Sequence, residues 1–146
     1  MANDKVFLDS SVLIAAVLSS RGGSFYILTS LKDTYEFKIN EYVLEETSRV
    51  LDVKFASAPG LKSRLFLLLG TAEIKILQDP SPAALRLLAK IINPEDAPIL
   101  ASALRESRYL ITLDEDFLVD QVRNFAKRQH LAVVRPREFL ERHRSA

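Results

Sequence analysis

The stretch YLITLDEDFL, residues 109–118, joins an apolar, β-rich run to three closely spaced carboxylates. A second stretch, VFLDSSVL at residues 6–13, has a similar design, because an apolar run stops at Asp9. The run VFL is apolar at every position, which is typical of a strand covered on both faces. Carboxylates packed together repel one another unless something offsets their charge. The two stretches therefore predict buried strands that deliver acids to one edge of a sheet.

Strand and helix patterns alternate along the whole chain. Strands are expected at residues 5–8, 35–40, 72–77, 109–113 and 131–136. Helices are expected at residues 11–19, 24–32, 41–55, 58–70, 83–92, 95–107, 115–130 and 136–144. Such alternation predicts a parallel sheet with helices on both faces. We therefore expect a single α/β domain over residues 1–146, a three-layer α/β/α sandwich with a mainly parallel five-stranded sheet.

Two residues mark expected helix ends. Ser24 is expected to cap the amino end of the second helix, since its hydroxyl can accept a backbone hydrogen bond there. Gly70 is expected to cap the carboxyl end of the fourth helix. Both expectations rest on residue type alone.

The composition excludes several classes of protein. The chain has 146 residues, of which 48% are hydrophobic, and this suits one domain with one core. It has no cysteine, so it has no disulfide framework and no thiolate metal site. Only two histidines are present, both near the carboxyl end, which argues against a zinc site. No apolar stretch approaches the ~20 residues of a membrane span, so we expect a cytoplasmic protein without a membrane partner.

Acids from distant parts of the chain are expected at one edge of the sheet. Asp9, Asp114 and Asp116 follow strands directly, and Glu45 and Glu46 lie near the start of the helix after the second strand. Asp96 lies near the start of the helix that precedes the fourth strand. Each acid alone can be explained as a helix cap or as a charge that complements a helix dipole. Together they suit a hard cation such as Mg²⁺ or Mn²⁺, which prefers oxygen ligands.

Four stretches in this order resemble the PIN-domain family of nucleases: VFLDSSVLIAA, INEYVLEETSRVL, PEDAPILASAL and YLITLDEDFL. The resemblance covers nearly the whole chain, and the order and spacing of the motifs make it specific. It implies a PIN-like fold and an active metal-dependent endoribonuclease. With no appended domain expected, the chain resembles the subgroup of VapC-like toxins.

The resemblance also implies roles for individual residues. Asp9, Glu46, Asp96 and Asp114 match the family's catalytic acids, and Glu46 is preferred over Glu45 because Leu44 lies two residues before it. The implied ligands of Mg²⁺ or Mn²⁺ are Asp9, Asp96, Asp114 and the accessory acid Asp116. Ser11, where many members have Asn, and Thr112 are implied to orient the ligands through hydrogen bonds. The implied reaction is in-line attack of an activated water on the phosphorus.

The carboxyl-terminal segment from Gln121 onward is basic, with seven Lys or Arg against two Glu. This segment is either a solvated helical face or a surface that follows RNA phosphates. If it binds RNA, the candidate contacts are Arg123, Lys127, Arg128, Arg135 and Arg137. For a toxin of this subgroup, the implied partners are RNA, a cognate antitoxin protein and a second copy of the chain.

Other functions remain open at this point. A PIN-domain nuclease can serve in RNA processing or maturation, and an acidic cage can belong to a non-catalytic metal- or nucleic-acid-binding module. A haloacid-dehalogenase-like phosphatase requires an aspartate where Ser11 stands. A receiver domain requires paired acids after the first strand, which this chain lacks.

Overall fold

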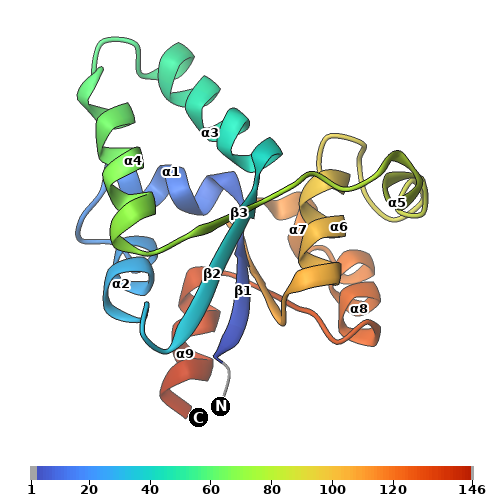
Figure 1. Ribbon diagram of the computed structural model, residues 1–146. Helices are drawn as coiled ribbons and strands as arrows, with labels where there is room; N and C mark the ends of the chain where they lie inside the picture. Colours follow the sequence, from blue (N-terminus) through green and yellow to red (C-terminus); the bar gives the residue numbers. More distant parts are fainter. Residues whose placement is uncertain (1–2, 146) are drawn as a thin grey trace.

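The computed structural model describes residues 3–145 and places five strands side by side in one sheet (Figure 1). The strand order is β3-β2-β1-β4-β5, and every neighbouring pair is parallel. The strands are β1 (Asp4–Leu8), β2 (Tyr35–Asn40), β3 (Lys75–Leu77), β4 (Tyr109–Ile111) and β5 (Ala132–Val134). The predicted α/β class with a parallel five-stranded sheet is therefore confirmed.

Helices cover both faces of the sheet, which gives the predicted three layers (Figure 1). Helices α1, α2 and α4 pack together on one side, and α9 packs against α2. On the other side, α6 packs against β1 and β4, and α8 packs against α7 and β5. The bounds are α1 (Ser10–Leu18), α2 (Gly23–Ser30), α3 (Glu41–Lys54), α4 (Gly60–Thr71), α5 (Pro82–Arg86), α6 (Ala97–Glu106), α7 (Glu115–Leu118), α8 (Asp120–Arg128) and α9 (Pro136–Ser145).

The central strand β1 lies in the middle of the core. Val6, Phe7 and Leu8 are all fully buried, as the uninterrupted apolar run predicts. Within the described residues, no single helix is long and apolar enough to cross a membrane. Helices α1 and α2 together have the length and apolar composition of a membrane span, but the chain bends by 95° between them. Many of their apolar side chains, including Leu13 and Ile27, belong to the core.

Two predicted helix caps are wrong. Helix α2 begins one residue early, with Gly22 at the cap position, and Ser24 is buried inside the helix. Helix α4 continues through Gly70 to Thr71, and Glu73 adopts the left-handed conformation with φ 55°. The backbone N–H of Ile74 donates to the carbonyl of Leu69, so Glu73 occupies the position that usually favours glycine.

Two predicted helices are shorter or broken. The segment 83–92 is helical only as far as Arg86, and turns follow it. The predicted helix at 115–130 is interrupted at Val119, which is extended. A continuous helix would place Phe117 and Ala126, nine residues apart, on opposite faces. Both residues are fully buried, so the break allows both to face the core.

Asn40, the last residue of β2, connects two helices that carry candidate site residues. Its side chain is fully buried and caps α3 by accepting a hydrogen bond from the Val43 N–H at 2.9 Å. Its amide donates to the Pro98 carbonyl at 3.0 Å and to the Ser102 hydroxyl at 2.8 Å, both in α6. One buried amide therefore fixes the starts of α3 and α6 relative to the end of β2.

We expect Asn40→Ala to lower the free energy of unfolding by about 2–4 kcal/mol, because it removes a helix cap and leaves buried polar groups without partners. Urea denaturation measures this change. The matched control is Ser81→Ala, which removes the exposed cap of the short helix α5. A loss no larger in Asn40→Ala than in Ser81→Ala would show that the amide does not hold the two helices.

Candidate functional site

The pairing of β1 with β4 brings distant residues together at the carboxyl ends of the strands. Leu8 pairs with Ile111, and the Asp9 N–H donates to the Ile111 carbonyl at 3.1 Å. The Thr112 hydroxyl donates to Asp9 Oδ2 at 2.7 Å and accepts a hydrogen bond from the Asp114 N–H at 3.0 Å. Thr112 therefore links the acid after β1 to the acid after β4.

Asp9 is a helix cap and a member of the site at the same time. Its Oδ1 accepts from the Ser10 N–H at 2.8 Å, and its Oδ2 accepts from the Ser11 hydroxyl at 2.8 Å. The side chain is only 3% exposed. Burial raises the pKa of Asp9, although the hydrogen bonds from Thr112 and Ser11 oppose this rise. Ser11 and Thr112 thus both donate a hydrogen bond to Asp9 Oδ2.

Glu46 reaches the same edge from α3. The Ser10 hydroxyl donates to Glu46 Oε1, so Ser10 connects Glu46 to Asp9. Glu45, the alternative on the same helix, is exposed. The bond from Ser10 to Glu46 has no signal in the sequence, because it joins residues that are 36 positions apart.

Three further acids form a compact group, which we call the acid cluster: Asp96, Asp114 and Asp116. One carboxylate oxygen from each lies within 4.8 Å of the others. Asp114 caps α7 by accepting from the Asp116 N–H at 3.0 Å. The Asn93 amide donates to Asp116 Oδ2 at 3.4 Å, a contact that no motif predicted.

Asp96 is the most buried of the three acids. It stands at the cap position of α6 but makes no side-chain cap bond, and its Oδ2 is buried with no hydrogen-bond partner among residues 3–145. Burial raises its pKa to about 7, and the neighbouring charges of Asp114, Asp116 and Asp9 add to the rise. Such an unsatisfied carboxylate oxygen among other carboxylates is the donor arrangement that a hard divalent cation satisfies.

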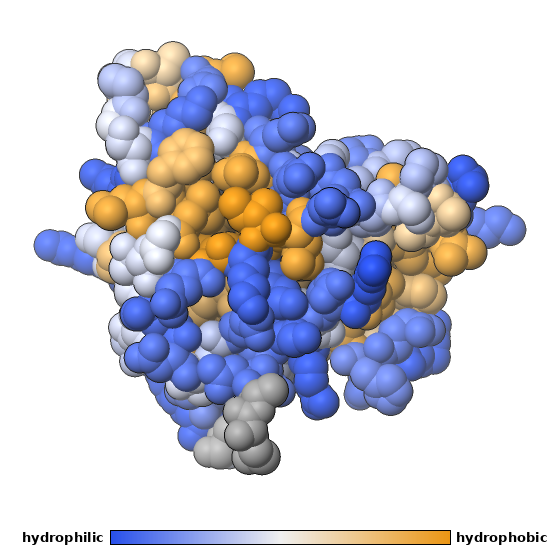
Figure 2. Space-filling view, viewed as in Figure 1, coloured by the Kyte–Doolittle hydropathy of each residue, from blue (hydrophilic) through white to orange (hydrophobic). Residues whose placement is uncertain are grey.

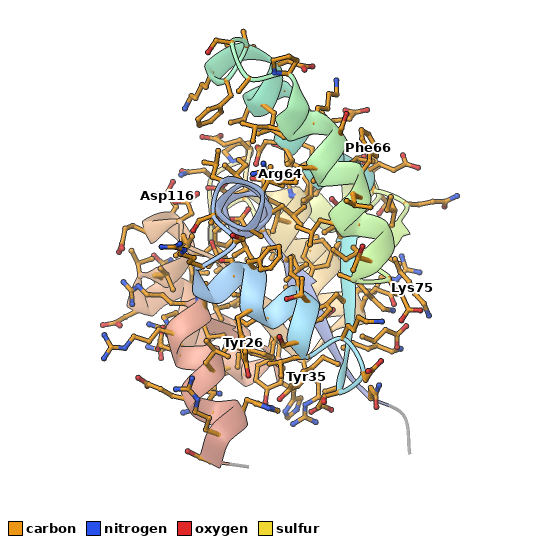
Figure 3. The ribbon with its side chains drawn as sticks, turned by 90° about the vertical axis from the view of Figure 1, so that its left-hand side faces the viewer. Tyr26, Tyr35, Arg64, Phe66, Lys75 and Asp116 are labelled. Atoms are coloured by element: carbon orange, nitrogen blue, oxygen red, sulfur yellow. The ribbon has the colours of Figure 1, made fainter. Side chains whose placement is uncertain are left out.

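The structure therefore brings Asp9, Glu46, Asp96, Asp114 and Asp116 to one edge of the sheet. In Figure 3, Asp116 lies at the left of the upper half, whereas Tyr35, from the amino end of β2, lies in the lower half. The residues that fit a divalent cation are those of the acid cluster, with Asp9 beside them. Helix capping and clustering are compatible at Asp9 and Asp114, so neither explanation excludes the other.

The basic residues proposed for RNA contact differ in whether they have an ionic partner. Arg135 pairs with Glu115 at 3.2 Å, Arg123 with Glu138 at 2.7 Å and Arg137 with Glu141 at 3.3 Å. Lys127 and Arg128 are exposed, and no carboxylate of residues 3–145 lies within ion-pair distance of them. Three of the five candidate cations are thus already paired inside the protein.

Comparison with known proteins gives the same fold from independent sources. The crystal structure of VapBC2 from Rickettsia felis, bound to a DNA fragment from their promoter, aligns with a TM-score of 0.66 at 20% identity, over 90% of this chain and 98% of that chain. PAE2754 from Pyrobaculum aerophilum aligns with a TM-score of 0.66 at 16% identity, over 98% of this chain and 91% of that chain. A search of curated protein sequences found no significant match.

At these identities the two alignments establish a shared fold. The family itself is shown by sequence, because the PIN domain matches residues 6–120. This range contains most of β1, all of β2, β3 and β4, and every acid of the site described above. The chain belongs to the PIN-domain family.

Proposed function

We propose that the chain is an endoribonuclease that hydrolyses RNA phosphodiester bonds with the help of Mg²⁺ or Mn²⁺. PIN domains are generally nucleases. The observation that carries the proposal is the acid cluster, where a buried oxygen of Asp96 lacks any partner beside two other carboxylates. A neutral hydrogen-bond network would satisfy such an oxygen, whereas a cation site leaves it available.

The residues around the cluster would hold the ion and fix the direction of its ligands. When bound, Mg²⁺ or Mn²⁺ supplies polarisation of the phosphoryl group and lowers the pKa of a water. Asp96, Asp114 and Asp116 would bind it, with Asp9 and Glu46 beside them. Ser11 and Thr112 fix the rotamer of Asp9, and Ser10 fixes that of Glu46, as residues behind metal ligands commonly do.

We further propose that the protein is the toxin of a type II toxin–antitoxin pair, with an antitoxin protein as its partner, in the cytoplasm. The fold shared with VapBC2 of Rickettsia felis supports this assignment.

A homodimer is the proposed assembly. Figure 2 shows an apolar area over α4 and β3, and Phe66 and Ile76 of these elements are 53% and 46% exposed. Figure 3 shows Phe66 on α4 from the side.

We expect Asp114→Asn and Asp96→Asn to reduce metal-dependent RNA cleavage by about 100-fold or more, because each removes a charged donor from the cluster. Single-turnover cleavage of RNA with Mg²⁺, Mn²⁺ or EDTA measures the effect. Asp33→Asn is the matched control, since it removes the same charge from an exposed turn. Equal cleavage by Asp114→Asn and the wild type would contradict the proposed function.

We also expect Asp96→Asn to stabilise the metal-free protein above pH 7. The pKa of Asp96 is about 7 when folded and near 3.8 when unfolded, so the folded chain binds more protons. Stability of the wild type therefore falls as pH rises from about 4 to about 7, and it stays low above that range. The gain in Asp96→Asn should reach about 2–4 kcal/mol at pH 8.

Thermal unfolding in EDTA between pH 4 and pH 8 measures this gain. Asp33→Asn should show no comparable pH dependence. Addition of Mn²⁺ should raise the melting temperature of the wild type more than that of Asp96→Asn, since binding to the folded state stabilises it. A pH-independent difference between Asp96→Asn and the wild type would show that charge repulsion at Asp96 is not the cause.

A further inference from the structure

A groove of about 550 Å³ follows the outer edge of β5, away from the acid cluster. Its walls come from α8 and α9, and its floor includes Ala132 and Val133 of the strand. The strand β5 is the last in the sheet, so this groove lies along one open side of the sheet. We call it the edge groove.

The floor of the edge groove is closed to a peptide strand. Arg123 Nε donates to the Val133 carbonyl at 3.1 Å, and Arg123 Nη2 pairs with Glu138 at 2.7 Å. Glu138 Oε1 also accepts from the Arg135 N–H at 3.1 Å. These side chains occupy outward-facing backbone groups at the edge of β5, as proteins do to prevent unwanted strand pairing. A partner that adds a β-strand is therefore disfavoured here.

Beside the pair of Arg123 and Glu138, three cations and one acid, Asp120, line the edge groove, so the remaining charge is positive. Burial would raise the pKa of Glu138, but hydrogen bonds from Arg135 and Arg123 lower it, so Glu138 is a satisfied anion. Arg108, Lys127 and Arg142 also line the groove and are exposed. Among residues 3–145, no carboxylate lies within 4.0 Å of these three cations.

The three cations come from different elements. Arg108 directly precedes β4, Lys127 lies in the last turn of α8, and Arg142 lies in α9. Cations spread in this way suit several phosphates of one strand rather than a single small anion. Asn124 and the exposed ring of His130 line the same groove and can bond or stack with bases.

His130 has a backbone conformation that its residue type disfavours. Its φ is 66°, and the Leu131 N–H donates to the Ala126 carbonyl, so His130 holds the left-handed position that ends α8. Glycine is favoured at this position because it has no side chain to clash. A histidine here therefore costs some stability compared with glycine, and it places an exposed imidazole ring in the lining of the groove.

The groove is separated from the acids by the length of a strand. Arg108 precedes β4 and Thr112 follows it, a span of about 13 Å at ~3.3 Å per residue. Asp120 of the lining lies four residues after Asp116, so this one end of the groove is within about 14 Å of the acid cluster along the chain. An RNA strand at the acid cluster can therefore continue into the groove over several nucleotides.

We propose that the edge groove binds the RNA substrate several nucleotides away from the bond that is cut, so that the preferred substrate is a long or folded RNA. This proposal rests on the proposed nuclease function. It assigns the RNA contact to Arg108, Lys127 and Arg142, and gives Arg123 a structural role at the strand edge.

The test is a double charge reversal, Lys127→Glu with Arg142→Glu, compared with the control Lys54→Glu with Arg86→Glu. The control cations are also exposed, and they lie outside the groove. Cleavage is measured on two RNAs that contain the same cleaved bond, a folded RNA of about 75 nucleotides and a four-nucleotide RNA. The first is long enough to fill the groove as well as the acid cluster, whereas the second is at the lower limit of a single binding site. The groove variant should raise KM for the folded RNA at least tenfold and leave kcat and the short substrate unchanged.

Binding separates failure of this proposal from failure of the nuclease function. Binding of the folded RNA is measured by fluorescence anisotropy. Every protein in this assay carries Asp114→Asn, so that the RNA is not cut during the measurement. A plot of the logarithm of the association constant against the logarithm of salt concentration has a negative slope. The groove variant should make this slope less steep by about 1.4–1.8, as expected for two lost phosphate contacts. If the groove variant and the control variant have the same RNA affinity and the same salt dependence, the proposal is wrong. The groove would then be a candidate surface for a protein partner instead. Equal losses on both RNA lengths would overturn it as well.

A second substitution distinguishes the functional role of His130 from a structural one. His130→Gly should raise the melting temperature by about 2–4 °C, because it relieves the left-handed strain. It should also weaken binding of the folded RNA threefold or more. Glu73→Gly is the matched control, since Glu73 has φ 55° and lies outside the groove. A rise in stability with unchanged RNA affinity in His130→Gly would remove His130 from the proposed contact.

Discussion

The pairing of β1 with β4 is the constraint on which the rest of this structure depends. It aligns Leu8 with Ile111, so the residues that follow the two strands emerge side by side although they are about a hundred positions apart. The chain leaves β1 toward β2 on one side and meets β4 on the other, which makes this edge the switch point of the sheet. Acids placed directly after these strands must therefore converge.

This constraint explains why much of the site could be predicted from the sequence. The rule needs only the positions where buried strands end, and the runs VFL and YLI mark them clearly. Asp9 and Asp114 follow from that rule, and Asp96 was expected there from its position near the start of a helix, whereas the choice of Glu46 over Glu45 came from matching the motifs of the family. Local signals also support each acid, because Asp9 and Asp114 cap helices. The same residue types therefore serve the fold locally and the site globally.

The remaining contacts depend on distances that no local pattern encodes. The bond from Ser10 to Glu46 and the bond from Asn93 to Asp116 join side chains that only tertiary packing brings together. The break at Val119 arises because Phe117 and Ala126 must both be buried, which a helical pattern alone does not reveal. The basic tail shows the same limit, since its net charge does not indicate that Arg123 is bound to Glu138.

The two charged regions of the protein differ in how their charge is maintained. At the acid cluster, a buried carboxylate without a partner opposes folding of the metal-free chain, so rigid strands and the buried Asn40 amide must hold the acids in place. At the edge groove, Arg123 and Glu138 neutralise each other, and exposed cations on three elements remain around them. A negative end and a positive side on one small domain favour a ligand that needs both, namely a polyanion whose cleaved bond meets a cation at the acids. Under the proposed function, the sheet would hold both the acids that act on the bond and the cations that contact the rest of the RNA.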